Sequence, residues 1–453
     1  MEVRVGAGQG FYGDTPDGGL AVVERGEVSH LCCDALSELT VAILEKDRQR
    51  DPGLGYVRDL PLFARTLLRP ARHHGVRWIT NGGGINPMAG AAAVARVACE
   101  LGMPELRIGV VTGDNLIDRL PALVAAGLPH IDSGAALTAE AAQAVVAVAY
   151  LGAQPVVAAL AGGADVVVTG RVADAALFLA PLVHELGWAW DDWDRLAVGA
   201  VAGHLLECSG QATGGNFSGD WWTIQGLDEV GYPIAEVSAA GDLTVLKAHG
   251  TGGRVDWRTV REQLLYEVTD PTAYVTPDVV VDLGEVELAD AGADRVAVTG
   301  VRGRPRPDQL KVVLGHPAGW AGTVSLVYSW PDALAKVDHA AELVARMTSR
   351  VGLEPLELRV ERQGVDALHG TAAPPPLEPA EVGLRLSARF ASEAEAARFA
   401  RLAMSLALNG PPHLGGGSPP QPPRALLGLW PSLVDRAGVE DGVEVRVVEA
   451  GAL

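Results

Sequence analysis

The chain has 453 residues and a formal charge of −20, which comes from 36 basic and 56 acidic side chains. Hydrophobic residues make up 48% of it, enough for a large core, and the length predicts two or three domains. The negative charge argues against nucleic acid and anionic membranes as partners. An anionic small molecule held in a local basic pocket is still compatible with this balance.

The N-terminus and the cysteines indicate the cellular compartment. Met1–Gly6 has the pattern of a strand and lacks the apolar segment of a signal peptide. No uninterrupted apolar run of about 18 residues predicts a membrane span. The cysteines lack metal-binding spacings, and the adjacent pair Cys32 and Cys33 is difficult to join by a disulfide. We therefore expect a cytoplasmic protein with reduced thiols and no bound metal.

Short apolar strands alternate with alanine-rich helices through the first half of the chain. The predicted strands are Val3–Val5, Ser29–Cys33, Val76–Thr80, Leu106–Val111 and Asp165–Val168. Helices of crossover length separate most of them, which predicts a mostly parallel α/β sheet domain over residues 1–225. The loops after such strands gather at the carboxyl edge of the sheet, where α/β proteins bind ligands. The residues expected at this edge are Gly8, Gln9, Asp34, Asn81, Gly82, Gly83, Asp114, Arg171 and Asp174.

From about residue 226 the pattern becomes mixed. Tyr232–Val237 and Leu243–Ala248 flank a turn and predict a hairpin. The later strands and helices lack the regular alternation of the first half, so we predict a mixed α+β domain over residues 226–453. Asn409–Pro423 carries six prolines and four glycines, which predicts a loop, either a lid or a surface connection. The apolar tail from Leu426 to Val448 is expected to pack back onto the body.

Three glycine-rich loops each have a functional and a structural interpretation. Gly6–Gly10 follows a strand, but its third glycine falls one residue too early for the dinucleotide fingerprint, so we expect no NAD. This loop either lets backbone N–H groups approach a substrate or forms a tight turn. Asn81–Gly84 precedes a helix whose N-terminus can bind an anion. His249–Arg254, which contains Thr251 and Gly252, either cradles a phosphate or forms a turn.

Arg171 follows the fifth predicted strand, three residues before Asp174. Its guanidinium can hold a carboxylate or phosphate of a ligand through two parallel hydrogen bonds. The structural alternative is an Arg171–Asp174 pair that caps the following helix.

His204, Glu207 and Cys208 are the densest group of reactive side chains. On a helix they occupy positions i, i+3 and i+4, which lie on one face, and the glycine-rich segment Thr213–Asn216 follows them. With Glu207 as base and His204 as acid, the group suits proton transfer next to a carbonyl. With Cys208 as a nucleophile beside His204, it suits thioester chemistry. A packing role in the core is the structural alternative, and the second motif of a di-metal site is missing.

Taken in order, these motifs resemble the acyclic terpene utilisation A (AtuA) family. The resemblance covers nearly the whole chain and rests on Gly6–Gly8, Asp34 with Glu38 and Thr40, Asn81–Pro87, Thr112–Asp114, Gly170–Asp174, Gly203–Asn216, Gly250–Gly253, Tyr274–Val279 and Asn409–Pro412. The chain departs from the family pattern at Gln9-Gly10 and at Cys32-Cys33. The resemblance implies a role near the cleavage or hydration of a branched CoA thioester.

Together, the residues and the resemblance predict an enzyme of the lyase or hydratase type. Its substrate would be an acyl-CoA or a related branched or hydroxy carboxylic acid, with no cofactor other than the CoA of the substrate, and we expect a homo-oligomer. The predicted catalytic residues are His204, Glu207, Cys208 and Asp174. The predicted substrate-binding residues are Gly8, Gln9, Asn81, Gly82, Gly83, Asp114, Arg171, Asn216, Thr251 and Gly252. Two alternatives are a Cys208-dependent acyl transferase or thioesterase and a non-catalytic subunit that binds a thioester for another enzyme.

Overall fold

The computed structural model describes residues 1–374 and 378–453, which form two compact units. Unit 1 comprises Met1–Thr138, Ala144–Leu314 and Leu429–Leu453, and unit 2 comprises Ala139–Gln143 and Gly315–Gly428. The chain leaves unit 1 within β14 (Gln309–Ser329) and returns to it within β18 (Arg424–Asp435). Among the described residues, no helix has both the length and the apolar character needed to cross a membrane.

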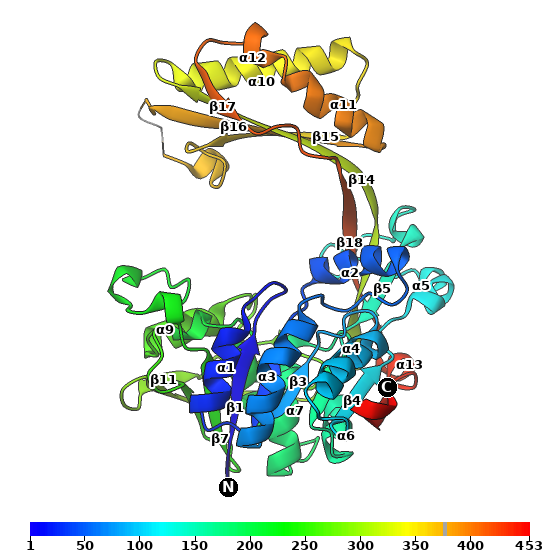
Figure 1. Ribbon diagram of the computed structural model, residues 1–453, viewed down its shortest axis with the longest axis vertical. Helices are drawn as coiled ribbons and strands as arrows, with labels where there is room; N and C mark the ends of the chain where they lie inside the picture. Colours follow the sequence, from blue (N-terminus) through cyan, green and yellow to red (C-terminus); the bar gives the residue numbers. More distant parts are fainter. Residues whose placement is uncertain (375–377) are drawn as a thin grey trace. The chain divides into compact units, whose positions relative to one another are not determined.

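Unit 1 is built on a ten-stranded mixed sheet with the order β11-β12-β8-β7-β1-β2-β3-β6-β4-β19. Figure 1 labels β1, β3, β4, β7 and β11 of this sheet. Its central strands run parallel: β1 (Glu2–Gln9), β2 (His30–Cys33), β3 (Arg77–Thr80), β6 (Val166–Thr169) and β4 (Arg107–Thr112). The antiparallel strands at the two sides are β7 (Pro233–Ser238), β8 (Leu243–Lys247), β12 (Arg295–Thr299), β11 (Glu287–Asp290) and β19 (Glu444–Glu449). The predicted α/β class with a mostly parallel N-terminal sheet is confirmed.

Helices cover the central strands in two layers. In one layer α1 (Pro16–Arg25), α3 (Leu60–His74) and α4 (Pro87–Glu100) pack against one another, and in the other α6 (Gln154–Ala161), α7 (Asp174–Leu186) and α8 (Trp193–Leu206) do the same. Strands covered on both faces consist of continuous apolar runs. This explains why β6, with the sequence Val-Val-Val-Thr, is buried along its whole length.

The chain reverses its direction along the sheet between β4 and β6. From β1 to β4 the crossovers proceed one way, and α6 then leads back to β6, which lies between β3 and β4. Right-handed crossovers in opposite directions put their helices on opposite faces. The loop after β3 therefore leads to α4 in one layer, and the loop after the adjacent β6 leads to α7 in the other. Neighbouring strand ends with diverging loops form the crevice where open α/β sheets bind ligands.

Local sequence sets the helix ends at this crevice. α4 begins at Pro87, after Asn86, whose side chain accepts a hydrogen bond from the Ala89 N–H. α7 has no side-chain cap, but Asp174 in its first turn faces the positive end of the helix dipole. α8 ends at Leu206 with Glu207 as its C-cap, so Cys208 lies beyond the helix rather than on its face.

The strands that follow residue 225 extend the unit 1 sheet. β7 and β8 form the predicted hairpin, and β7 pairs with β1, whose edge would otherwise offer unpaired backbone groups. A small sheet of β9 (Tyr274–Val275), β10 (Val280–Asp282) and β13 (Arg302–Arg304) follows. The remaining elements of unit 1 are α2 (Glu38–Arg50), α5 (Leu120–Ala126), β5 (Val146–Ala149), α9 (Trp257–Leu265) and α13 (Arg436–Glu440).

Unit 2 is an antiparallel sheet with helices packed on it. The sheet has the order β15 (Glu357–Gln363), β16 (Glu381–Phe390), β14 and β17 (Leu414–Gly417), and α10 (Ala333–Arg350), α11 (Glu393–Ala403) and α12 (Leu406–Asn409) follow its strands. Its core joins both kinds of element, for example through Phe390 on the sheet and Phe399 on α11. A capping box between Ser392 and Glu395 starts α11.

The segment expected to be a loop, Asn409–Pro423, differs from that expectation in two places. Asn409 ends α12, and Leu414–Gly417 forms the strand β17, which pairs with β14 opposite Leu326–Tyr328. Glycine has a low strand propensity because it has no side chain to pack. Here the pairing depends on backbone hydrogen bonds to a long neighbouring strand, which residue composition does not reveal.

Candidate functional site

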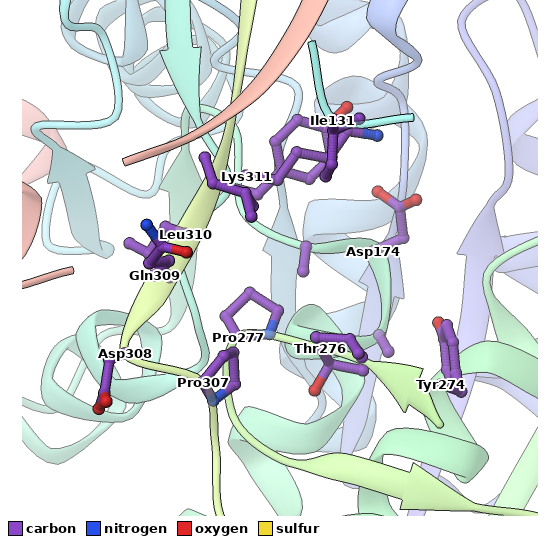
Figure 2. Close-up of a pocket in the computed structure, with 15 residues that line it drawn as sticks. Ile131, Asp174, Tyr274, Thr276, Pro277, Pro307, Asp308, Gln309, Leu310 and Lys311 are labelled. Atoms are coloured by element: carbon purple, nitrogen blue, oxygen red, sulfur yellow. The ribbon is translucent and has the colours of Figure 1, made fainter. Parts of the chain in front are cut away.

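A cavity of about 670 Å³ lies within unit 1, at the N-terminus of α7. Figure 2 shows its side chains. The lining residues are Ile131, Tyr150, Ala173, Asp174, Ala175, Tyr274, Val275, Thr276, Pro277, Pro307, Asp308, Gln309, Leu310, Lys311 and Leu433. Cavities of this size hold small ligands, and this one combines a mostly apolar lining with a few polar groups, as ligand sites usually do.

The polar groups of the cavity come from separate parts of the chain. Asp174 begins α7, Tyr274 belongs to β9, and Lys311 belongs to β14. Figure 2 shows Asp174 and Tyr274 on one side of the view with Lys311 across from them, whereas the Asp308 carboxylate points away from the others. The Asp174 side chain is 33% exposed, so its carboxylate can meet a bound molecule.

Arg171 fixes Asp174 in position from below the surface. Its side chain is only 3% exposed; one guanidinium nitrogen donates to Asp174 Oδ1 at 2.5 Å, and another donates to the Leu36 carbonyl. Its backbone N–H donates to Asp114 Oδ2 at 2.7 Å, and its guanidinium lies 4.1 Å from the centre of the Tyr150 ring. Protein groups therefore engage most of this guanidinium; the Arg171–Asp174 pair of the structural alternative is present, but it does not cap α7.

A second cation, Lys311, lies beside the same tyrosine. Its Nζ pairs with Glu38 Oε1 at 2.6 Å and lies 4.9 Å from the centre of the Tyr150 ring. The Tyr150 hydroxyl donates to the same Glu38 oxygen at 3.3 Å. Because the ring face of tyrosine attracts cations, Tyr150 holds both Arg171 and Lys311 near the cavity.

His204 and Glu207 form a buried pair that does not line the cavity. His204 Nδ1 and Glu207 Oε1 lie 3.0 Å apart, and the side chains are 2% and 7% exposed. Burial raises the pKa of Glu207 to about 7, although the His204 charge opposes this. Burial lowers the pKa of His204, but attraction to Glu207 outweighs it and the net direction is upward. The His204 ring centre lies 5.3 Å from that of Tyr274, which separates the pair from the cavity.

Cys208 is poorly suited to act as a nucleophile in this arrangement. It is half-buried, and burial together with the Glu207 charge raises the pKa of its thiol to about 12. The reactive species is the thiolate. At neutral pH, Cys208 is therefore almost entirely the unreactive thiol.

We accordingly expect iodoacetamide at pH 7 to spare Cys208. The exposed Cys99 should react first, whereas Cys32 and Cys33 are buried. Mass spectrometry of peptides after a short exposure measures the sites, and turnover of the alkylated protein should match that of the untreated one. Cys99→Ser serves as the control, because it removes the expected site of reaction. Rapid labelling of Cys208 with loss of turnover would contradict this prediction and favour the acyl-transferase alternative.

Asp34 and Asn81 form a buried connection between the ends of β2 and β3. Asn81 Nδ2 donates to Asp34 Oδ1 at 2.6 Å, and Asn81 Oδ1 accepts from the Ala35 N–H at 2.7 Å. Burial, with the nearby Asp174 charge, raises the pKa of Asp34 well above its usual value. Asn81 is fully buried and does not line the cavity, so its visible role is to hold Asp34 in place.

The glycines after β3 allow close packing at the crevice. A Cβ on Gly83 would lie 2.5 Å from the Thr169 carbonyl oxygen, and one on Gly82 would lie 3.1 Å from Leu60 and Thr80 side-chain atoms. A Cβ on Gly170 would lie 2.3 Å from the Asp114 carboxylate. These glycines bring the ends of β3, β6 and β4 together, and the cavity forms beside them.

Asp114 should make the stability of the protein depend on pH. Burial raises its pKa to about 7, although the Arg171 N–H bond opposes this. The folded protein thus retains a proton that the unfolded chain releases above about pH 4. The stabilisation that this retained proton provides is complete below about pH 4. It is lost as the pH rises to about 7, and the free energy of unfolding falls by at most about 4 kcal/mol. Urea unfolding of wild type and Asp114→Asn from pH 4.5 to 7.5 measures this.

The Asp114→Asn variant should show a flatter dependence of unfolding free energy on pH, because its amide does not titrate. Asp118→Asn, at an exposed position nearby, is the matched control and should follow the wild type. Parallel curves for wild type and Asp114→Asn would exclude Asp114 as the source.

The other predicted binding residues lie outside the cavity lining. Gly8 packs in the sheet, where a Cβ would lie 2.6 Å from Cys33 Sγ, and Gln9 is buried with its Nε2 donating to the Phe11 carbonyl. The Thr251 hydroxyl donates to the Ala248 carbonyl, and the Gly252 N–H donates to the Glu229 carbonyl. Asn216 is exposed, with a positive φ of 58°. The structure therefore does not bring these residues together with Asp174.

Five residues that line the cavity were not predicted from the sequence to belong to the site: Tyr150, Tyr274, Thr276, Gln309 and Lys311. Some signals for them existed. Tyr274 and Thr276 lie in a segment that carries the family resemblance, and Lys311 is one of only four lysines in a chain that strongly prefers arginine. Tyr150 lies next to β5, whose alanine-rich sequence reads as part of a helix.

The family description "Acyclic terpene utilisation family protein AtuA" matches residues 3–445, nearly the whole chain. The chain belongs to this family. The resemblance inferred from the motifs is therefore confirmed, together with a general connection to acyclic terpene utilisation. Comparison with curated proteins and with solved structures finds no match.

Proposed function

We propose that this protein is an acid–base enzyme that hydrates or dehydrates a branched carboxylic acid or its CoA thioester. The observation that carries the proposal is the Asp174 carboxylate, accessible at the end of a helix in an otherwise mostly apolar cavity of about 670 Å³. A carboxylate positioned beside a bound substrate can act as a general base. Family membership supports a terpenoid-related substrate class.

The lining suits a branched hydrocarbon chain with one polar end. Ile131, Leu310 and Leu433 supply apolar surface, and burying each methylene of a ligand there contributes about 0.8 kcal/mol. Lys311 supplies a positive charge that a substrate carboxylate can share with Glu38. The polar end of the substrate would then lie near Lys311 and the N-terminus of α7.

The N-terminus of α7 contributes to the chemistry. The first N–H groups of a helix have no partner within it and carry a partial positive charge. The Ala173 N–H donates to the Leu151 carbonyl, but Asp174 and Ala175 in the first turn also line the cavity, so their N–H groups can receive the carbonyl oxygen of the substrate. Negative charge on that oxygen in the transition state is stabilised there. Asp174 removes the adjacent C–H proton, and Arg171 keeps the carboxylate in place.

A thermal-shift screen followed by an assay tests the function. The purified protein is heated with CoA, branched acyl-CoA thioesters, free branched hydroxy acids and NAD. A ligand at about 100 times its dissociation constant stabilises a fold by roughly 2.7 kcal/mol, which raises the melting temperature visibly. We expect a shift with an acyl-CoA or hydroxy acid and none with NAD. Formation or loss of the conjugated double bond is then followed by absorbance.

The outcomes separate this proposal from its alternatives. Turnover of a stabilising ligand supports the hydratase or lyase. Binding without any turnover, together with co-purification of a second enzyme, favours a non-catalytic thioester-binding subunit. A shift with NAD alone would contradict the proposal.

A further inference from the structure

A buried polar cluster behind one wall of the cavity has no part in the mechanism above. It contains the His204–Glu207 pair and Gln263 of α9, whose Nε2 donates to the His204 carbonyl at 2.8 Å. Glu207 Oε2 and Gln263 Oε1 are buried and have no partner among the described residues, whereas the His204 ring also lies near the backbone carbonyls of Gln263 and Leu264. Buried polar atoms normally meet a protein group or an ordered water. Two such atoms beside the His204 ring are the partners that an ordered water would take.

Tyr274 is the side chain that contacts both the cluster and the cavity. It lines the cavity, and its ring lies 5.3 Å from the His204 ring at an angle of 53°. In Figure 2 its hydroxyl points toward the side of the cavity that carries Asp174. The turn after β9 is rigid, because the Thr276 hydroxyl and N–H both bond to the Val279 carbonyl. Pairing of Tyr274 with Val281 of β10 holds its main chain between the two.

We propose that Tyr274 is the second catalytic residue, the general acid, and that the His204–Glu207 pair positions it and returns its proton through a bridging water. This inference rests on the proposed hydration and dehydration of the substrate. It adds a general acid, which gives a proton to the leaving oxygen, to the general base Asp174.

In the dehydration direction the proton transfers balance. Asp174 takes the proton from the carbon next to the carbonyl, and the electron pair of that C–H bond forms the double bond. The C–O bond of the substrate hydroxyl breaks, and the Tyr274 hydroxyl gives its proton to the leaving oxygen, which departs as water. The Tyr274 phenolate regains a proton from His204 through the water. Asp174 and His204 then return to their starting states by exchange with solvent.

The electrostatics of the pair agree with this role. The pKa of Glu207 is raised to about 7 by burial, so the pair exchanges protons near neutral pH. Burial also raises the pKa of Tyr274, which keeps it protonated, as an acid requires. The titratable groups that face the pair and Tyr274 are Asp34, Asp174, Cys208 and Glu267.

Tyr274→Phe is the first test, with Tyr232→Phe as the matched control. The Tyr232 hydroxyl is buried outside the cavity and donates to Asp14. Tyr274→Phe should lower kcat about 100-fold or more, while the branched acyl-CoA or hydroxy acid that stabilises the wild type still raises the melting temperature. Tyr232→Phe should retain kcat. Glu207→Gln should lower kcat and shift its pH profile with KM unchanged, which a merely structural role would not produce.

Histidine ring NMR tests the link without turnover. The ¹⁵N signals of His204, assigned by their loss in His204→Gln, are followed with pH in wild type, Tyr274→Phe and Tyr232→Phe. Loss of the hydroxyl should move the His204 titration midpoint by about half a pH unit or more, whereas Tyr232→Phe should not move it. An unchanged midpoint, or full kcat in Tyr274→Phe, would overturn the relay alone. A wild type with neither ligand shift nor turnover would overturn the proposed function with it.

Discussion

Replacing Asp174 by asparagine should lower kcat by about 10² to 10⁴-fold, because the general base is lost. The fold should survive, since an asparagine oxygen can still accept the hydrogen bond that Arg171 donates to Asp174 Oδ1. The free energy of unfolding should fall by about 1–3 kcal/mol, because the hydrogen bond survives but the buried Arg171 cation loses the charge of its partner. Steady-state kinetics on the substrate found by thermal shift measures kcat, and urea unfolding measures stability.

Asp308→Asn is the control for this experiment. Asp308 belongs to the same cavity lining, but its carboxylate points away from the other polar groups (Figure 2). It should leave kcat within about threefold, as expected for a carboxylate without a chemical role. If Asp174→Asn retained full turnover, another group would be the base, and the proposed mechanism would be wrong at its central residue.

The sequence predicted the crevice but not the cavity. Alternating apolar strands and crossover helices predict a parallel sheet, and polar residues directly after strands predict its ligand-binding edge. Asn81 is hydrogen-bonded to Asp34 there, and Arg171 reaches the same loop by donating to the carbonyl of Leu36, whose N–H donates to Asp34. One wall of the cavity, however, comes from β14 and β18, which are distant in the sequence. Only tertiary pairing brings Lys311 and Leu433 to Asp174.

The His-x-x-Glu-Cys motif shows how helix ends limit such predictions. Periodicity correctly places His204 and Glu207 side by side, and they are bonded. The same argument fails for Cys208, because α8 ends at Leu206, before the motif is complete. Burial then raises the thiol pKa. Burial is a tertiary property, so spacing alone cannot distinguish a nucleophile from a half-buried thiol.

Glycines in loops after strands have a ligand-binding and a structural interpretation. The contacts of Gly83 and Gly170 account for the structural one. At Gly83 and Gly170 a Cβ would meet backbone or carboxylate oxygens within 2.5 Å. Close approach between strand ends requires glycine there, just as close approach to a ligand would. The pattern of glycines is the same in both cases. Only the neighbouring atoms distinguish them.

The stability of the candidate site depends on Arg171. It is a buried cation among buried or half-buried carboxyl groups: it pairs with Asp174, and its charge lowers the pKa of Asp34 and Asp114 against the effect of burial. Arg171→Met should destabilise the fold by about 3–5 kcal/mol, the usual cost of removing one partner from a buried ion pair. Urea unfolding at pH 7.5 measures this loss.

The pH dependence of the destabilisation in Arg171→Met shows whether the charge of Arg171 or its packing stabilises the fold. Without the arginine the carboxyl groups bind protons more tightly, so the Arg171→Met defect should shrink as the pH falls toward 5. Arg171→Lys keeps the charge but loses the planar fork that reaches both Leu36 and Asp174. The free energy of unfolding of Arg171→Lys should lie between those of wild type and Arg171→Met at pH 7.5. A defect in Arg171→Met that is equal at both pH values would mean that packing, rather than compensation of buried carboxylates, makes Arg171 necessary.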